Sequence, residues 1–274
     1  ALGLPQPEFA HISLILGKDR SKMSKRHGAT SVAHYKALGY LPEAVVNYLA
    51  LLGWAPPGEQ EILSQNELIE WFSLDHVASN PAVFDIDKLK WINSCYLKKL
   101  DLETLTDMAL PYLKASGFID ANCSMEQLAW IRQVVAVVRD YVSFVAQIPE
   151  HAAMFFHDDV TMENEETVAV LRDSNVCKVM ELFAAKLAVV EQLTGEQVYI
   201  MLKDIEKELN LSKRKVFMPV RVALTGKMHG PEITSIVPLL GVERTMGRIQ
   251  RCLALARSSV IEEKFERTLG DGEK

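Results

Sequence analysis

The spacing of apolar residues predicts one short strand near the start of the chain and helices almost everywhere after it. Ile12, Leu14 and Leu16 recur at every second position, and Gly17-Lys18-Asp19 then breaks the pattern. This arrangement is typical of a short, largely buried strand that ends in a loop. Beyond Ser31 the apolar residues recur at helical spacing between short breaks. We therefore expect a mainly α fold built from small helical subdomains.

Capping residues predict where these helices begin. A Ser or Thr followed three residues later by Glu or Gln is typical of a capping box, and an Asp just before an apolar stripe can cap in a similar way. A proline in the first turn is a further start signal. The caps are Ser64, Asp85, Asp101, Ser124 and Thr194, and the prolines are Pro42, Pro219 and Pro231.

The second half of the chain contains one long helical pattern and a polar end. The helix that starts at Ser124 is expected to run until Pro149, because no turn signal interrupts it. The last helix is expected to begin after Gly241. Beyond about Arg257 the residues are polar and end in Gly270-Asp271-Gly272, so this tail is expected to fray.

Composition favours a soluble globular protein of two or three domains. Hydrophobic residues make up 49% of the 274 residues, and no apolar stretch reaches the roughly 20 residues needed to cross a bilayer.

The cysteines are scattered without a Cys-x-x-Cys pair, so we expect buried thiols, no zinc site and a reducing cytoplasm. They are Cys95, Cys123, Cys177 and Cys252. The four tryptophans, Trp54, Trp71, Trp91 and Trp130, are expected to pack in the core.

The charge is unevenly distributed along the chain. The net charge is −6, but residues 203–257 contain 11 Lys and Arg against five Asp and Glu. A positive end on an acidic body can bind a polyanion locally, although ordinary surface charge explains the same counts. His151 and His157, with Asp158 and Asp159, lack the spacing of a complete ligand set, so no metal is assigned.

Two basic clusters are candidate anion-binding sites. The first, Lys22-Met23-Ser24-Lys25-Arg26, lies between the predicted strand and a helix start, where lysines and backbone N–H groups can converge on phosphate oxygens. Such spacing also occurs on ordinary solvated faces. The second is Lys213-Arg214-Lys215, followed by Arg221 and the turn Gly230-Pro231. It can contact RNA phosphates and an unstacked base, or it can be a salt bridge and a simple turn.

Several blocks of sequence together resemble the glutamyl-tRNA synthetases, a family of class I aminoacyl-tRNA synthetases. The run from Lys22 to Ala29 is similar to the second signature loop of that family. The other blocks follow in the family's order over nearly the whole chain. They are Gly39-Tyr40-Leu41-Pro42-Glu43-Ala44, Asn47 to Trp54, Phe84-Asp85, Trp91-Ile92-Asn93, and Pro219 to Gly226.

The resemblance implies roles for particular residues. Lys22 and Lys25 are expected to be catalytic, and Lys22, Met23, Ser24, Lys25 and Arg26 to bind ATP, which enters with Mg²⁺. The residues expected to contact tRNA are Lys213, Arg214, Lys215, Arg221, Gly230, Pro231 and Ile233. The position that recognises the last anticodon base matches Tyr141, or Arg139 if the alignment slips, and this choice stays open.

The resemblance also implies what surrounds the chain. The family's first signature, a His-x-Gly-His turn, is not matched by His11-Ile12-Ser13-Leu14, so we interpret the chain as the C-terminal portion of a synthetase that is inactive alone. The implied parts are residues 1–105, the end of the catalytic domain with a stem-contact domain, and two anticodon-binding subdomains, 106–160 and 161–274. The implied partners are tRNA, at its acceptor-stem side and anticodon loop, and ATP and glutamate through the missing N-terminal domain.

We expect a cytoplasmic monomer that does not bind membranes. The function is expected to be the tRNA-binding portion of an enzyme that attaches glutamate to tRNA through glutamyl-adenylate. An alternative is a stand-alone RNA-binding module derived from a synthetase, and another is an acidic helical scaffold that binds only protein. The retained Lys22–Arg26 loop argues against a pure RNA binder.

Overall fold

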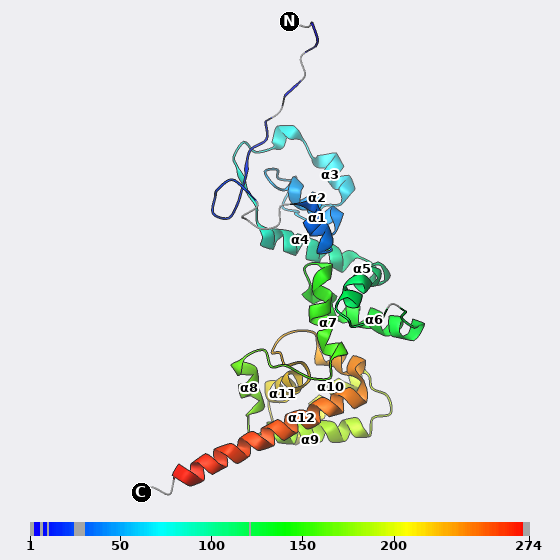
Figure 1. Cartoon of the computed structure of the whole chain (residues 1–274), viewed down its shortest axis with the longest axis vertical. Helices are drawn as coiled ribbons and strands as arrows, with labels where there is room; N and C mark the ends of the chain where they lie inside the picture. The colour runs from blue at the N-terminus through cyan, green and yellow to red at the C-terminus, as the bar shows by residue number, and fades with distance from the viewer. Residues whose placement is uncertain (1–2, 6–7, 10, 25–30, 121, 271–274) are drawn as a thin grey trace. The chain divides into compact units, whose positions relative to one another are not determined.

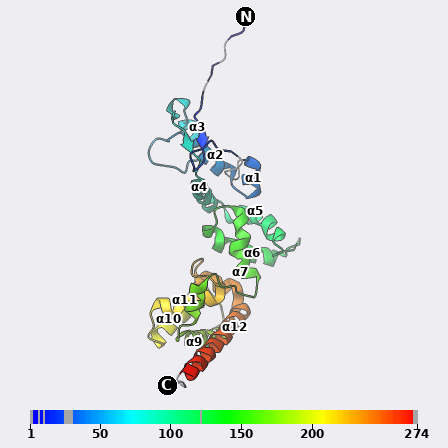
Figure 2. The same cartoon turned by 60° about the vertical axis from the view of Figure 1, so that its left-hand side comes forward.

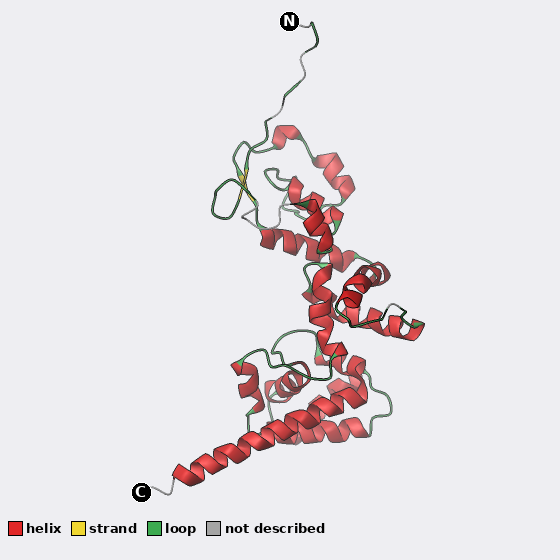
Figure 3. Ribbon diagram, in the orientation of Figure 1, coloured by secondary structure: helices red, strands yellow, loops and turns green. Residues whose placement is uncertain are grey.

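The computed structural model describes residues 3–5, 8–9, 11–24, 31–120 and 122–270, without the side chains of residue 255 and residues 257–270. Helices dominate these residues, and Figure 3 shows how little strand they contain. The two-residue strands β1 (Ile15–Leu16) and β2 (Ala82–Val83) pair in parallel, with Ile15 opposite Ala82. The predicted mainly α fold class is therefore confirmed.

The chain divides into two compact units. Unit 1 comprises Ala1–Ser116 and Val142–Ile148, and unit 2 comprises Gly117–Tyr141 and Pro149–Lys274. The helices of the first 116 residues are α1 (Val32–Ala37), α2 (Pro42–Ala50), α3 (Gln65–Trp71), α4 (Ile86–Lys99) and α5 (Leu102–Ala115), with a 3₁₀ turn at Leu74–His76. They run from blue to green in Figure 1. The division into 1–105, 106–160 and 161–274 stays a prediction.

Unit 1 is organised by α2 packing on α4, and buried amides connect the surrounding segments. Asn47, fully buried on α2, accepts hydrogen bonds from the Leu63 N–H (2.9 Å) and the Tyr96 hydroxyl (2.8 Å). Asn93, fully buried on α4, accepts from the Leu41 N–H (2.8 Å) and donates to the Ser143 carbonyl (2.6 Å). Because buried polar groups need partners, these two residues fix the loops around the helices.

Residues 142–148 complete unit 1 although they follow α6 (Met125–Val138) in the chain. The Ala146 N–H donates to the Leu38 carbonyl at 3.0 Å, and Val145 is fully buried. Gly39 has φ of +76°, and a side chain there would meet the Val145 Cβ at 2.6 Å. This close approach requires glycine at position 39.

Unit 2 is built around α12 (Ile233–Gly270), which packs on α6, α9, α10 and α11. Figures 1 and 2 both show α12 lying alongside α9. The bounds are α6 (Met125–Val138), α7 (Ile148–Phe156), α8 (Glu165–Leu171), α9 (Val176–Ala188), α10 (Gly195–Glu208) and α11 (Lys213–Thr225), with a 3₁₀ turn at Arg139–Tyr141. A further 3₁₀ turn, Val145–Gln147, lies in the segment of unit 1 that follows α6. Gly241, at φ +75° and ψ 169°, divides α12 where the sequence predicts a new helix.

The predicted caps are confirmed. The side chains of Asp85, Asp101, Ser124 and Thr194 each accept a backbone N–H from the first turn of α4, α5, α6 and α10. Ser64 and Glu67 form a complete capping box at α3. Pro42 occupies the first turn of α2. Local hydrogen bonds determine these boundaries, so a local pattern is enough to predict them.

Three predicted boundaries are wrong. The helix from Ser124 ends at Val138, and Pro149 lies in the first turn of α7 instead of terminating a helix. Pro219 lies inside α11, which begins at Lys213, so Pro219 does not open that helix. The chain beyond Arg257 continues as α12 to Gly270, where the sequence predicts a frayed tail.

Predicted burial is also wrong at several positions. Ile12 and Leu14 are 70% and 55% exposed, so the segment that ends in β1 is not a largely buried strand. Trp91 is 47% exposed, because it lies on the outer face of α4, opposite the buried Leu89, Ile92 and Asn93. Of the cysteines only Cys252 is buried; the other three are partly exposed. Across the described part of the chain, no helix combines the length and apolar character that a membrane span needs.

Candidate nucleotide and RNA interfaces

A tight turn after β1 leads into the first basic cluster. The Gly17 N–H donates to the Ser21 carbonyl and the Arg20 N–H to the Gly17 carbonyl, both at 2.9 Å. Asp19 Oδ1 accepts the Ser21 N–H at 3.0 Å, and Arg20 has φ of +61°. An Asx-type hydrogen bond and a left-handed residue together make the chain reverse direction within five residues.

Lys22 and Met23 then return along β1. Lys22 forms an antiparallel bridge with Leu16, and the Met23 N–H donates to the Ile15 carbonyl at 3.2 Å. Lys22, Met23 and Ser24 line a hollow of about 660 Å³, whose other lining residues are Ser13, Leu14, Ile15, Val32, Tyr35, Val45, Tyr48, Leu49, Leu52, Phe84 and Leu89. The start of the predicted ATP-binding loop therefore borders a largely apolar cavity. Lys25 and Arg26 lie outside the described residues.

The tyrosines beneath this loop remain neutral at physiological pH. Burial raises the pKa of Tyr40 to about 12, with a smaller contribution from Tyr35. Burial also raises the pKa of Tyr48, whose hydroxyl accepts the Asp85 N–H at 2.7 Å. A buried phenol resists ionisation because the phenolate loses hydration. The Tyr48 ring lines the hollow as part of an apolar wall, and neither tyrosine supplies a base.

The second basic cluster forms the first turn of α11. Lys213, Arg214 and Lys215 are all exposed, and the Ser212 side chain makes no capping hydrogen bond to this helix. The Lys213 ammonium lies 5.2 Å from the centre of the Phe217 ring. Three cations therefore surround the N–H groups at a helix N-terminus, where an anion is favoured.

Arg221 connects this turn to Gly230-Pro231. Its Nη1 donates to the Pro231 carbonyl at 2.9 Å, so the arginine is bonded to the turn and makes no salt bridge to a described residue. Ile233 is only 2% exposed, and Pro231 is also buried. A hollow of about 380 Å³ lies beside Arg221 and the first turn of α11. It is lined by Lys213, Arg214, Phe217, Met218, Arg221, Glu232 and Ile233. The structure thus brings together most of the predicted RNA-contacting residues of unit 2.

Arg139 and Tyr141 lie apart from that hollow, in the 3₁₀ turn after α6. Tyr141 is 44% exposed, whereas Arg139 is partly buried and its Nε has no hydrogen-bond partner among the described residues. The more accessible of the two candidates is therefore the phenol of Tyr141.

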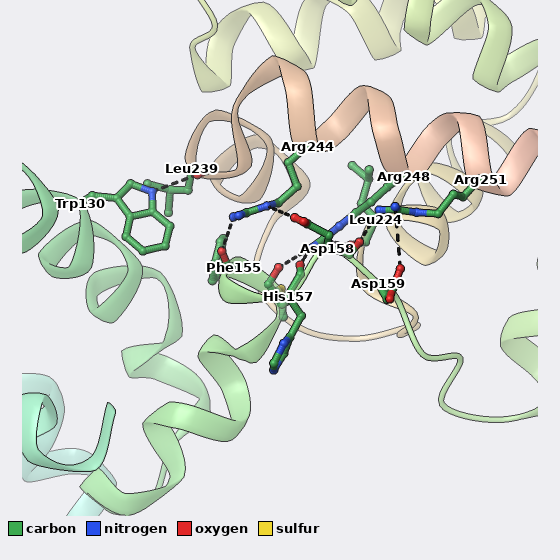
Figure 4. A network of polar contacts seen from close by, with 11 residues as sticks. Trp130, Phe155, His157, Asp158, Asp159, Leu224, Leu239, Arg244, Arg248 and Arg251 are labelled. Carbon is green, nitrogen blue, oxygen red and sulfur yellow. Dashed lines mark hydrogen bonds and ion pairs between the residues drawn. The ribbon is translucent and has the colours of Figure 1, made fainter. Parts of the chain in front are cut away.

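Sequence reasoning missed an arginine network on α12. Arg248 is 1% exposed, and its guanidinium donates to the carbonyls of Leu224, Met154 and His157, the last at 2.6 Å. Arg244 and Arg251 extend the row along the same helix face. Arg244 Nε donates to Asp158 Oδ1 at 2.8 Å, and Arg251 donates to the Asp158 carbonyl (Figure 4). The only signal in the sequence is that these three arginines are spaced three, four and seven residues apart, which places them on one face of a helix.

This network satisfies the carbonyls at two helix ends, and its central arginine, Arg248, is buried there. The carbonyls of Met154, Phe155 and His157 lie at the end of α7, and Leu224 lies near the end of α11. Helix C-termini leave carbonyls without partners, and arginines satisfy them. Burial lowers the pKa of Arg248 to about 10, which still leaves it cationic at neutral pH. Part of the positive excess seen in residues 203–257 is therefore used inside unit 2.

The described residues do not gather a metal site. They contain no group of three or more His, Cys, Asp or Glu side chains able to hold an ion. Burial lowers the pKa of His151, which favours a neutral imidazole.

Comparison with known proteins agrees with the motifs. The family described as tRNA synthetases class I (E and Q), catalytic domain, matches residues 1–91, and the family described as anticodon binding domain matches residues 104–253. The glutamate–tRNA ligase of Desulforamulus reducens is 49% identical over 92% of this chain and 52% of its own length. That of Heliobacterium modesticaldum is 49% identical over 93% of this chain, again 52% of its own length.

Solved structures give the same result. A crystal structure of a glutamate–tRNA ligase from Elizabethkingia meningosepticum, in complex with its amino acid, superposes with a TM-score of 0.78 at 27% identity. The match covers 92% of this chain and 52% of that one, so the chain spans about half the length of the relatives it matches. The predicted resemblance is confirmed. With more than half of its residues matched, the chain belongs to the anticodon binding domain family, and its homologues are glutamate–tRNA ligases.

Proposed function

We propose that this chain supplies the tRNA-binding portion and the second signature loop of a glutamate–tRNA ligase. The whole enzyme would join glutamate to tRNA in two steps, through glutamyl-adenylate formed from ATP. One observation carries the proposal: each compact unit presents basic residues beside a hollow, Lys22 in unit 1 and the first turn of α11 in unit 2. These two surfaces suit two different polyanions, a triphosphate and an RNA.

The loop in unit 1 fits the chemistry of adenylate formation. A glutamate carboxylate attacks the α-phosphorus of ATP and pyrophosphate leaves, so negative charge grows on the leaving group. Ammonium groups held close to that group stabilise the transition state more than the ground state. Lys22 and Lys25 would serve this role, and Met23 and Ser24 would form the wall next to the nucleotide. Magnesium would enter with the triphosphate as part of the substrate.

The surface in unit 2 fits a single-stranded RNA loop. Lys213, Arg214 and Lys215 can neutralise phosphates, and their exposed first turn adds backbone N–H donors. The hollow beside Phe217 and Arg221 has the aromatic and guanidinium surfaces on which an unstacked base lies. Anticodon bases offer such a target. Ile233 would contribute through its backbone, because its side chain is buried.

Binding of tRNA to this chain tests the RNA part of the proposal. We expect log affinity to fall linearly with log salt concentration. The triple variant Lys213→Gln, Arg214→Gln, Lys215→Gln should lower affinity and reduce the salt slope by about 0.7–0.9 for each phosphate that is no longer neutralised. A matched control is Arg172→Gln, Lys178→Gln, Lys207→Gln, which removes three exposed cations elsewhere in unit 2. If both triple variants lost the same affinity for tRNA, non-specific electrostatic attraction alone would explain the binding.

ATP–pyrophosphate exchange tests the catalytic part. The full-length ligase that contains this chain should exchange pyrophosphate into ATP in the presence of glutamate and tRNA, and Lys22→Ala should slow that exchange. If the full-length protein binds tRNA but never exchanges pyrophosphate, the stand-alone RNA-binding alternative is correct. If this chain shows no salt-dependent tRNA binding, the RNA part of the proposal is wrong.

A further inference from the structure

An ion pair joins the turn before the basic loop to the start of α4. Lys18, which lies within the turn after β1, places its Nζ 2.6 Å from Asp87 Oδ2 and 3.7 Å from Asp85 Oδ1. Asp87 is 69 positions further along the chain than Lys18. All three side chains are about half or more exposed. The contact therefore links two segments distant in sequence, at the surface.

The acceptor side of this pair is held in place independently of Lys18. Asp85 is the N-cap of α4 and accepts the N–H groups of Asp87 and Lys88 at 2.9 and 3.4 Å. The Asp85 N–H donates to the buried Tyr48 hydroxyl. Carboxylates at a helix N-terminus are favoured by the helix dipole. The Asp85 carboxylate is therefore fixed by the helix cap, and with Asp87 two positions later it forms an anionic point to which a lysine from another segment can attach.

The donor side leads directly into the residues proposed to bind ATP. Lys22 follows Lys18 by four positions, and the intervening turn is closed by the Gly17 N–H, which donates to the Ser21 carbonyl, and the Arg20 N–H, which donates to the Gly17 carbonyl. Upstream, β1 is tied to β2 through the Phe84 N–H, which donates to the Leu16 carbonyl at 2.8 Å. Pairing with β2 thus fixes the entry to the turn, and the Lys18 contact holds its tip.

We propose that Lys18 is a positioning residue for the basic loop, acting by attachment of the turn tip to Asp87 and Asp85. This inference rests on the proposed function, because it concerns the same loop and the same substrate. The attachment keeps Lys22 and Met23 paired against β1, where they border the 660 Å³ hollow. Since the pair is exposed, it holds the loop weakly, so the loop can release and re-form the contact as substrate and product exchange.

Charge and hydrogen bonding agree with this arrangement. The hydrogen bond and charge of Asp87 raise the pKa of Lys18, and Lys18 in turn lowers the pKa of Asp87. Lys90 also lies near Asp87, at 4.0 Å, but both are on α4. Lys90 therefore shares the same carboxylate without connecting it to the turn, which makes it a matched control.

Amide hydrogen exchange of this chain tests the attachment without any activity assay. Lys18→Gln and Asp87→Asn should each speed exchange of the Met23 amide by about two- to fivefold, the scale of an exposed ion pair. The double variant should exchange no faster than either single variant, because the two residues act through one contact. Lys90→Gln should leave the amide unchanged. An unchanged amide in Lys18→Gln, or multiplied effects in the double variant, would overturn the proposal.

ATP–pyrophosphate exchange of the full-length ligase tests the consequence. Lys18→Gln should lower kcat/KM for ATP by about two- to fivefold at low salt, and the ratio to wild type should approach one near 0.5 M salt, where exposed pairs are screened. The tRNA affinity should be unchanged. If wild type lacks exchange activity, the proposed function fails while the amide measurement still decides the attachment. If wild type is active and Lys18→Gln retains full kcat/KM at low salt, the positioning role is wrong.

Discussion

Each unit of this protein uses a basic side chain to tie distant segments together, but the two solutions differ in burial. In unit 1, Lys18 reaches Asp87 and Asp85 at the surface. In unit 2, Arg248 is buried and donates to the carbonyls of Leu224, Met154 and His157. Exposed pairs contribute little to stability, whereas breaking a buried charge network is strongly destabilising. Burial, more than charge, decides which connection is permanent.

The difference matches what each region is proposed to do. A loop that closes on a triphosphate must also release the product, so a weak surface contact is suitable. A surface that reads RNA bases gains from fixed geometry, and the C-terminal end of α11 is fixed by Arg248 while its N-terminal turn presents the cations. The largest expected effect on activity lies in the basic loop, the largest on stability lies in the buried network, and the smallest effect lies in a buried thiol.

Lys25→Ala should lower the adenylation rate of the full-length ligase about 100- to 1000-fold, the effect of removing one preorganised charge at a reacting phosphate. Affinity for tRNA should change less than twofold, because the proposed RNA surface lies on unit 2. Stopped-flow or exchange kinetics and a tRNA titration measure the two quantities. A comparable decrease in the adenylation rate and in the tRNA affinity would show that the two units do not have separate roles.

Arg248→Met should be the most destabilising change to the fold. It removes three hydrogen bonds and leaves buried carbonyls without donors, so the free energy of unfolding of unit 2 should fall by about 3–5 kcal/mol. Hydrogen exchange under mild denaturant, resolved by peptide, would measure each unit separately. Unit 1 should be unaffected, and Arg244→Met should cost less because Arg244 is partly exposed. Equal destabilisation of both units would contradict the assignment of this network to unit 2.

Asn47→Leu should destabilise unit 1 by about 1–3 kcal/mol, because the Leu63 N–H and the Glu61 carbonyl are left without their partner. This variant tests whether the loss in free energy of unfolding depends on how deeply the removed group is buried, and not on which unit contains it. Denaturant titration followed at Trp54, which is buried in unit 1, would measure it. A destabilisation no larger than that of Lys18→Gln would argue against the contrast.

Cys252 should give the smallest effect, seen only at alkaline pH. Burial raises the pKa of its thiol to about 11, above the ordinary value of 9.0. As pH rises past 9, the unfolded chain releases this proton first, so stability falls between about pH 9 and pH 11. Between pH 8 and pH 10 the decrease should be about 1.4 kcal/mol greater in wild type than in Cys252→Ala. Identical pH slopes would show that the thiol is accessible in the folded state.

Local features were predictable from sequence and tertiary ones were not. Ser64 with Glu67, and Asp85 before α4, are confirmed because a cap needs only its own first turn. Pro219 was misread as a helix start, since proline is tolerated inside α11 once Val216 and Val220 are buried in the core. Packing offsets the hydrogen bond that Pro219 cannot donate.

The same distinction between local and tertiary features applies to the candidate site residues. Basic runs and their family resemblance identified Lys22–Ser24 and Lys213–Lys215, because those residues are consecutive in sequence. The contact of Arg221 with Pro231 and the attachment of Lys18 to Asp87 join residues 10 and 69 positions apart. Arg248 resembled any other basic residue until its burial was known. The roles assigned to Arg139, Tyr141 and the loop residues remain predictions.

The path of the backbone between the units limits how this protein can be recombined. The chain leaves unit 1 after Ser116, returns for Val142–Ile148 and leaves again. A gene fusion that joins two homologues at one junction near residue 100 would give unit 1 a foreign Val145 against Gly39. Successful chimeras should therefore exchange residues 142–148 together with the N-terminal segment, so that three junctions, not one, separate the inherited parts.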